Sequence, residues 1–99
     1  MKKIEDVCLG SIQYVNAGND IVLDIWSTYD GRSIYKIYCG KVSGIEIKNN
    51  LHEDEDFFGV YVALLTISDS DGGAKPFISM ESGDLFIRVE CRNIVFDKV

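Results

Sequence analysis

The alternation of apolar and polar residues is most regular near the end of the chain. In residues 85–91 every odd position is apolar, and Arg88 and Glu90 lie between them. A period of two predicts a β-strand with one face in a core and the other in water. Residues 21–28 show the same alternation after a cluster of turn-forming residues at 16–20, and they predict a second clear strand.

Three other segments predict strands whose pattern is interrupted. In residues 4–15 the apolar positions change phase at Gly10, which predicts a β-bulge. In residues 45–48 alternation resumes after several small residues, which predicts a kinked continuation or a short corner between two strands. Residues 57–68 are nearly all apolar and rich in β-branched and aromatic types, so we expect a strand in the middle of a sandwich or against a partner.

Two turns allow the register of the strands around them to be predicted. A three-residue loop, Tyr29-Asp30-Gly31, with Gly31 left-handed, places core-like residues opposite each other and brings opposite charges together. The expected neighbours are Thr28 and Arg32, Trp26 and Ile34, Ile25 and Tyr35, Asp24 and Lys36, Leu23 and Ile37, and Ile21 and Cys39. A two-residue turn at Ser82-Gly83 pairs Met80 with Leu85 and Ile78 with Ile87.

These elements predict an all-β protein with one domain, residues 1–99. No segment has a convincing helical period, and turns recur about every ten residues, so we expect an antiparallel sandwich or partly open barrel of about seven or eight strands. Residues 37–42 and 89–94 share one order: apolar, any residue, Cys, two polar or small residues, β-branched apolar. This echo suggests two similar halves.

Charge and length limit the classes of partner that the protein is expected to bind. Ninety-nine residues suffice for one small core, and the net charge of −6 disfavours nucleic acid while suiting a basic protein partner. The first residues carry acids and no long apolar run, so neither a signal peptide nor a membrane anchor is expected, and we predict a cytoplasmic protein.

The three cysteines, Cys8, Cys39 and Cys91, are expected to be reduced and buried. The alternatives are a Cys39–Cys91 disulfide and a zinc site that uses His52, but the chain has a single His and no close-spaced pair of ligands. Residues 69–80 begin like a calcium loop yet end in Met80 rather than an acid. We therefore predict no metal and no cofactor.

The sequence also lacks a recognisable combination of catalytic residues. His52 lies in an acidic loop that would keep it protonated, and hydrated carboxylates there have no apolar surroundings to raise their pKa values. No glycine-rich loop between strand and helix supports nucleotide binding. A small nucleic-acid platform could be built from Arg32, Tyr35, Lys36, Tyr38 and Lys41, but the net acidity opposes it. We predict that the protein is not an enzyme.

Surface recognition is the remaining class of function. Trp26 and Tyr38 are candidate anchors of a protein interface, with half-buried cross-strand packing as the alternative. Four consecutive acids would speed the encounter with a basic protein, or would simply be a solvated loop. These acids are Glu53, Asp54, Glu55 and Asp56.

Residues 35–45, Pro76 and residues 85–94 together resemble small all-β bacterial immunity proteins of polymorphic toxin systems and their uncharacterised relatives. The resemblance is one of strand pattern and carries no functional residue. It implies a cytoplasmic protein that binds and blocks a toxin domain. Two alternatives remain: a structural β domain that forms a homodimer or larger homo-oligomer through the strand of residues 57–67, and a barrel that binds a small ligand.

Overall fold

The computed structural model describes residues 2–49, 60–68, 75–83 and 85–99, and these form one antiparallel sheet of eight strands. The strand order is β4-β7-β6-β5-β1-β2-β3-β8, and the sheet is not closed into a barrel. The all-β prediction and its strand count are confirmed. The strands are β1 (Lys2–Val15), β2 (Asp20–Ser27), β3 (Ser33–Gly40), β4 (Gly44–Asn49), β5 (Val60–Ser68), β6 (Phe77–Glu81), β7 (Leu85–Glu90) and β8 (Asn93–Lys98).

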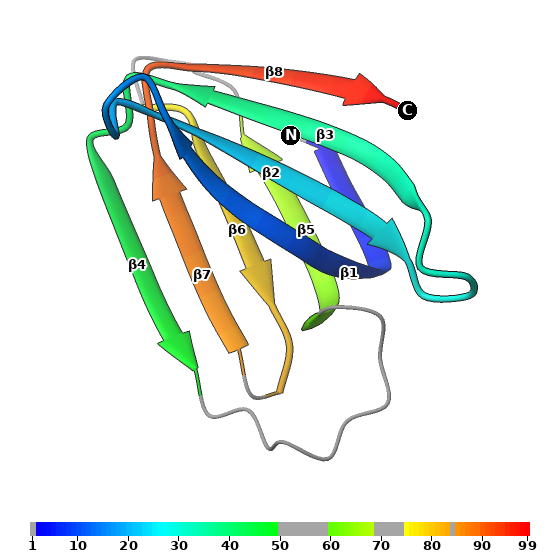
Figure 1. Cartoon of the computed structure of the whole chain (residues 1–99). Helices are drawn as coiled ribbons and strands as arrows, with labels where there is room; N and C mark the ends of the chain where they lie inside the picture. The colour runs from blue at the N-terminus through cyan, green and yellow to red at the C-terminus, as the bar shows by residue number, and fades with distance from the viewer. Residues whose placement is uncertain (1, 50–59, 69–74, 84) are drawn as a thin grey trace.

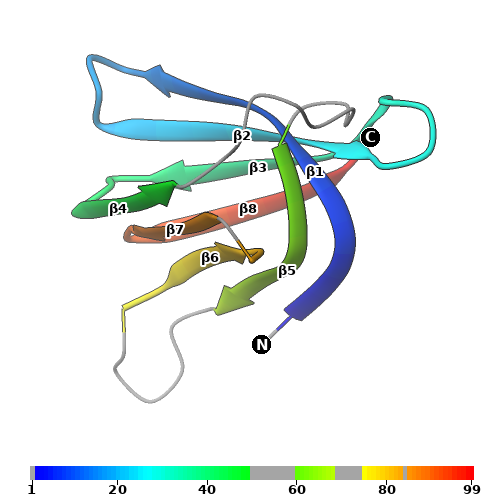
Figure 2. The ribbon, with the colours of Figure 1, turned by 90° about the horizontal axis from the view of Figure 1, so that it is seen from below.

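Strand β1 joins the two parts of the bent sheet (Figure 1). Its first part pairs with β5, from Lys2 to Leu9, and its second part pairs with β2, from Val7 to Val15. The strand curves strongly, so the part formed by β4, β7, β6 and β5 lies across from the part formed by β2, β3 and β8 (Figure 2). The apolar faces of both parts meet between them.

Two local distortions let β1 keep apolar residues on the inner face throughout this bend. Asp6 has a positive φ of 59°. At this residue the side chains that face inward switch from an even position, Ile4, to an odd position, Val7. Gly10 lies in a register shift between Leu9 and Ser11, where the phase changes again. The predicted bulge at Gly10 is therefore confirmed.

The bulge at Gly10 is covered by the indole ring of Trp26. A Cβ added to Gly10 would lie 2.0 Å from Trp26 Cε2, far inside van der Waals contact. Glycine is thus required at this position because the ring packs directly on the backbone. Trp26 is half-buried in this position.

The strand order reveals an internal two-fold relation between the halves of the chain. Strands β1-β2-β3 form one meander and β5-β6-β7 form another, and β1 pairs with β5 at the centre. The fourth strand of each half then pairs with the third strand of the other half: β4 pairs with β7, and β8 pairs with β3. If the labels β1–β4 and β5–β8 are exchanged, the same strand order is obtained when the sheet is read from its other end. The two similar halves expected from the sequence echo are therefore present in the topology.

The echoed cysteines lie at the two crossovers. Cys39 precedes the connection to β4, and Cys91 precedes the connection to β8. Two backbone hydrogen bonds link these connections: Arg92 N donates to Gly40 O at 2.9 Å, and Ser43 N donates to Glu90 O at 2.9 Å. Both thiols are buried and free in the structure, as is Cys8, so the expected burial of the three cysteines is confirmed. A hydrogen bond with Cys91, and burial, raise the pKa of Cys39.

A buried carboxylate, Asp20, fixes the first crossover to the β1–β2 turn. It accepts hydrogen bonds from the Tyr38 hydroxyl, from the Asn16 side-chain amide and, at 2.9 Å, from Lys41 N. Only 7% of Asp20 is exposed. These donors favour the ionised form, so the pKa of Asp20 is lowered, chiefly by Tyr38, while the carboxylate raises the pKa of Tyr38.

The predicted register of β2 and β3 is correct along the strands and wrong next to their loop. In β2 and β3 the pairs from Ile21–Cys39 to Ile25–Tyr35 are as expected. A register shift after Ile25 then places Trp26 opposite Ser33 rather than near Ile34, and Ser27 N donates to Arg32 O, so Thr28 does not face Arg32. Gly31 is left-handed as predicted, with φ of 71°.

The pairing of β6 with β7 differs from the prediction by two residues. Met80 pairs with Ile87 and Ile78 with Val89. Ser82 N donates to Leu85 O, so Ser82 lies opposite Leu85 and is not a central residue of the turn, contrary to the prediction. A shift of two preserves the face of each side chain. The core residues of these strands were therefore identified correctly despite the wrong partners.

Strand β5 is an internal strand, as its apolar sequence suggests. It pairs with β1 from Val60 to Ile67 and with β6 from Leu64 to Ser68. Residues 64–67 therefore offer no free edge to a second copy, and a homo-oligomer formed through the strand of residues 57–67 stays a prediction. Within the described ranges, no helix is long and apolar enough to cross a membrane.

Replacing Gly10 with Ala is expected to destabilise the protein by about 1–3 kcal/mol, because the new methyl group must displace the Trp26 ring. Urea unfolding followed by fluorescence measures this loss, and the single Trp of the chain reports the displacement as a red shift. Gly44→Ala is the matched control: its Cβ would meet nothing within 4 Å, and its effect should stay within about 0.5 kcal/mol. Equal losses in both variants would contradict the packing role of Gly10.

Replacing Asp20 with Asn is expected to lower the urea midpoint at pH 7, because an amide cannot accept all three hydrogen bonds. Since the folded-state pKa of Asp20 is lowered, its contribution is present above the unfolded pKa of about 3.9 and disappears as the pH falls through the folded value. The difference in urea midpoint between wild type and variant should therefore become smaller below about pH 4. A difference in urea midpoint that stays constant down to about pH 2 would contradict this role of the Asp20 carboxylate. Asp97→Asn, which changes an exposed carboxylate, is the control.

Candidate functional site

The two predicted aromatic anchors lie on the same outer face of the sheet but at opposite ends of the β2–β3 hairpin. Trp26 pairs with Ser33 near the hairpin loop, and Tyr38 pairs with Val22 at the other end. Both are half-buried and both alternate with core residues of their strands. The two predicted anchors thus share a face but are separated along the hairpin.

Neither aromatic residue is a free surface group. The Trp26 ring covers Gly10, and the Tyr38 hydroxyl is bound to Asp20. Each side chain therefore stabilises the fold as well as contributing to the surface. The predicted steering acids, Glu53 to Asp56, lie outside the described residues.

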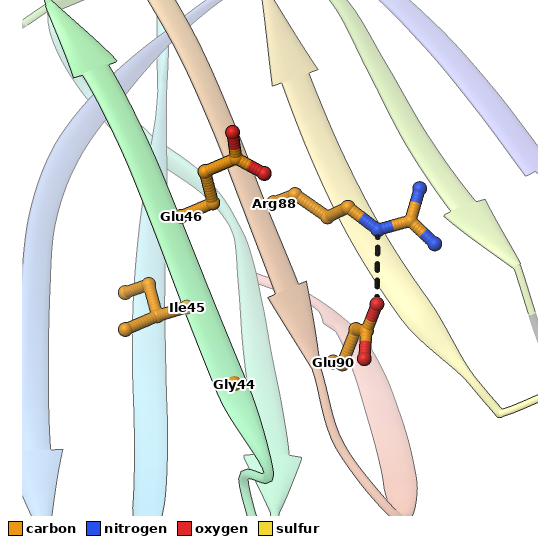
Figure 3. A pocket seen from close by; sticks show the side chains of 5 residues that line it. All are labelled: Gly44, Ile45, Glu46, Arg88 and Glu90. Atoms are coloured by element: carbon orange, nitrogen blue, oxygen red, sulfur yellow. Dashed lines mark hydrogen bonds and ion pairs between the residues drawn. The ribbon is translucent and has the colours of Figure 1, made fainter.

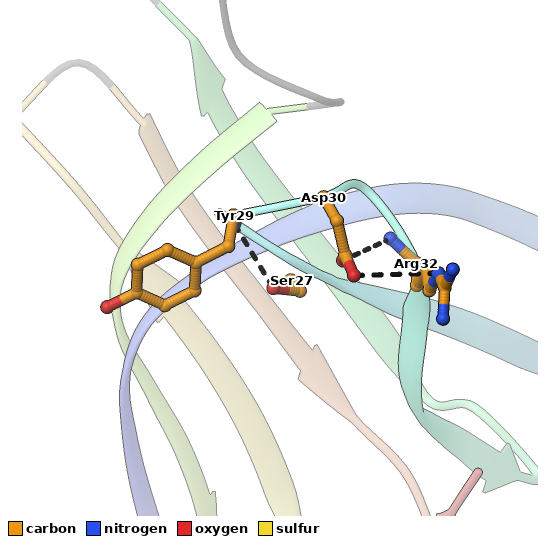
Figure 4. A network of polar contacts seen from close by, with 4 residues as sticks. All are labelled: Ser27, Tyr29, Asp30 and Arg32. Carbon is orange, nitrogen blue, oxygen red and sulfur yellow. Dashed lines mark hydrogen bonds and ion pairs between the residues drawn. The ribbon is translucent and has the colours of Figure 1, made fainter.

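The loop between β2 and β3 presents an aromatic residue that the sequence prediction did not select. The Tyr29 side chain is 89% exposed, and its ring points away from the polar contacts of the loop (Figure 4). Tyr29 N donates to Ser27 Oγ at 3.1 Å, and Arg32 N donates to Asp30 Oδ1 at 3.1 Å. An exposed ion pair of 3.5 Å also joins Arg32 Nε to Asp30 Oδ2.

The backbone of this loop is closed by two more hydrogen bonds. Ser27 N donates to Arg32 O at 2.8 Å and Gly31 N donates to Ser27 O at 3.1 Å. Tyr29 is therefore carried by a loop whose conformation is already set, so a partner that binds the ring would order only its side chain. Such pre-organisation lowers the entropy cost of binding.

The outer face beside this loop combines charge with apolar surface. Lys36 lies between Asp24 on β2 and Asp97 on β8, so the row carries two acids and one base. Further from the loop on the same face, Val95 pairs with Tyr38 and is 46% exposed. Aromatic residues are enriched in protein interfaces and polar groups surround their rims, so this face has features of a protein-binding surface.

A second surface feature is a shallow open groove on the other part of the sheet, at β4 and β7 (Figure 3). Its volume is about 190 Å³ and its lining is Gly44, Ile45, Glu46, Arg88 and Glu90. Arg88 Nε donates to Glu90 Oε1 at 3.3 Å, and the Arg88 guanidinium stacks over the Phe77 ring at 4.1 Å from its centroid. With its only cation engaged in this way, the groove offers no evident site for an anionic ligand.

Cys8 has the surroundings of a structural thiol. It pairs with Trp26 on one side and with Tyr61 on the other, and it is fully buried although it lies outside the main core cluster. Burial, followed by the charge of Asp6, raises the pKa of Cys8. The thiol therefore stays protonated, which is unsuitable for a nucleophile. In the described part of the chain, no three His, Cys, Asp or Glu side chains gather where they could hold a metal ion.

The signal that could have identified Tyr29 was present in the sequence. The residue lies in the predicted Tyr29-Asp30-Gly31 loop, where no cross-strand neighbour can cover a large ring. Attention to aromatic residues within tight turns, rather than to those on strands, would have selected it.

The fold is similar to that in a crystal structure of an uncharacterized protein from Neisseria gonorrhoeae. The TM-score is 0.81, and the match covers 99% of this chain and 97% of that one. Because the sequences are 20% identical, the likeness shows the fold alone.

No curated protein matches the sequence. The model of one protein family, described only as "-like", matches residues 2–98, and the chain therefore belongs to that family.

Proposed function

We propose that the protein is a non-catalytic binding module of the immunity type, which binds and blocks a basic toxin or effector domain in the cytoplasm. The observation that carries the proposal is Tyr29, an aromatic ring with 89% exposure on a hydrogen-bonded loop. Exposed aromatic residues on pre-organised loops are frequent anchors of protein interfaces.

The charge of the protein supports a basic partner. The chain carries a net charge of −6, and the outer face beside the Tyr29 loop includes Asp24 and Asp97 on either side of Lys36. A negative field of this kind accelerates the approach of a positively charged protein and disfavours binding to nucleic acid. Half-buried Trp26 adds apolar surface three positions before Tyr29.

The small-ligand alternative receives less support. The space between the two parts of the sheet is filled by the side chains of the core, including Leu23, Leu65 and Met80, each fully buried. The sheet is open, and the groove at β4 and β7 is shallow. A protein partner suits such a surface better than an enclosed ligand does.

The first test is binding to the toxin domain encoded by the neighbouring reading frame, measured by calorimetry. Replacing Tyr29 with Ala should weaken binding by about 30-fold or more, on the order of 2 kcal/mol, because it removes the central aromatic contact. Folding should be unaffected, since Tyr29 is 89% exposed and its ring points away from the polar contacts of the loop (Figure 4). The unfolding curve of the variant checks this.

Tyr14→Ala is the matched control for this experiment. Tyr14 is also exposed, at 61%, but it lies near the turn at the far end of β2 from Tyr29. Its removal should leave the affinity within about twofold. The proposal fails if no toxin domain is encoded there, if wild type does not bind it, or if both tyrosine variants bind equally.

Neutralising the four acids, Glu53, Asp54, Glu55 and Asp56, to their amides should slow association by about tenfold at low ionic strength, because long-range attraction is lost. Dissociation should change much less. Stopped-flow association rates at two salt concentrations measure the effect, which should shrink as salt rises. An unchanged association rate would show that these acids do not steer the partner.

A further inference from the structure

The outer edge of β4 has no strand partner among the described residues, and apolar side chains lie beside it. In that part of the chain β4 pairs with β7 alone and forms one end of the sheet (Figure 1). Ile45 and Ile47 belong to the inner face, since they pair with Val89 and Ile87, yet they are 38% and 50% exposed. Edges of this kind tend to pair with another strand.

The charges of β4 are arranged symmetrically about Ile47. Glu46 precedes it and Lys48 follows it, and these side chains are 54% and 73% exposed. If two copies of β4 pair antiparallel with Ile47 opposite Ile47 of the second copy, each Glu46 faces Lys48 of the other chain. Two opposite-charge pairs then flank an apolar centre, an arrangement that stabilises cross-strand pairing.

We propose that the protein forms a two-fold symmetric homodimer in which β4 pairs antiparallel with β4 of a second copy. Ile47 lies on the two-fold axis, and the eight-stranded sheet continues from one copy into the other. The exposed Ile45 and Ile47 of both chains form one apolar row across the junction. This surface is separate from the Tyr29 loop, so the dimer does not rest on the proposed function.

The neighbours of Glu46 leave it available to a second copy. Its cross-strand neighbour is Arg88, but that guanidinium donates to Glu90 and stacks on Phe77. Within one chain Glu46 contacts Lys48 at 3.4 Å, in an exposed pair whose rearrangement costs little. Dimerisation exchanges each of these intrachain pairs for a pair between the chains.

The edge at β8 does not fit a second copy in the same way. Phe96 on its inner face is already covered, because Lys2 Nζ lies 4.0 Å from its ring centroid and the Tyr35 ring lies 4.8 Å away. Antiparallel pairing about Phe96 would place Asp97 opposite Val95 and Lys98 opposite Ile94, so no charges would match. The complementarity that favours self-pairing is therefore specific to β4.

Charge reversal tests both the strand and the register. Wild type should show a concentration-dependent monomer–dimer equilibrium in sedimentation experiments. Glu46→Lys and Lys48→Glu should each weaken self-association by about tenfold or more, because both ion pairs become like-charge pairs. A mixture of the two variants should dimerise again, since every lysine of one chain then faces a glutamate of the other.

Three results would overturn the proposal: a wild type that is monomeric up to about 1 mM, single variants that dimerise like wild type, or a mixture that fails to associate. Lys98→Glu on β8 is the matched control and should leave the equilibrium unchanged. Circular dichroism of each single variant shows whether it is folded, and the recovery of dimer in the mixture separates lost complementarity from lost structure.

A cysteine placed on the axis gives an independent test. Ile47→Cys should form an intermolecular disulfide under mild oxidation, because directly opposite residues have Cβ atoms about 4.5–5.5 Å apart. Ile45→Cys should not, because the two introduced thiols would lie about 13 Å apart along the strands. The three native thiols are buried and should not interfere. Equal cross-linking of both variants, or of neither, would overturn the register.

Discussion

The structure depends on one strand being shared by two parts of a bent sheet. Strand β1 pairs with β5 over its first part and with β2 over its second, so its apolar residues must face inward on both sides of the bend. A regular strand cannot do this, because its side chains alternate strictly. The left-handed residue Asp6 and the bulge at Gly10 supply the two changes of phase. The packing of Trp26 on Gly10 follows from that bend.

The crossing of the fourth strands gives the two halves different surfaces despite their common topology. Strand β8 carries Phe96, which is covered by Lys2 and Tyr35, whereas β4 carries Ile45 and Ile47 with open surface beside them. The loop with Tyr29 belongs to the first half alone. Both proposed binding surfaces therefore lie where the two halves depart from their internal symmetry.

Much of the fold could be predicted from the sequence, because alternation with a period of two identifies strands and the inward face of each. The predicted partners failed near turns, at Trp26 and at Met80, because loop closure and bulges shift the register without changing the apolar pattern. For the candidate site, composition drew attention to Trp26 and Tyr38. Their contacts with Gly10 and Asp20 depend on tertiary structure, so the sequence could not show that both residues support the fold.

The pairing of the last strand with the third has a consequence for the newly synthesised chain. Gly40 finds its partner in Asn93, roughly fifty residues later, so the edge of β3 stays unprotected on the ribosome for about 3–10 s at ordinary rates of translation. During that interval the nascent first half exposes strand edges that could pair with other chains. The sheet is therefore complete only once β8 has been synthesised.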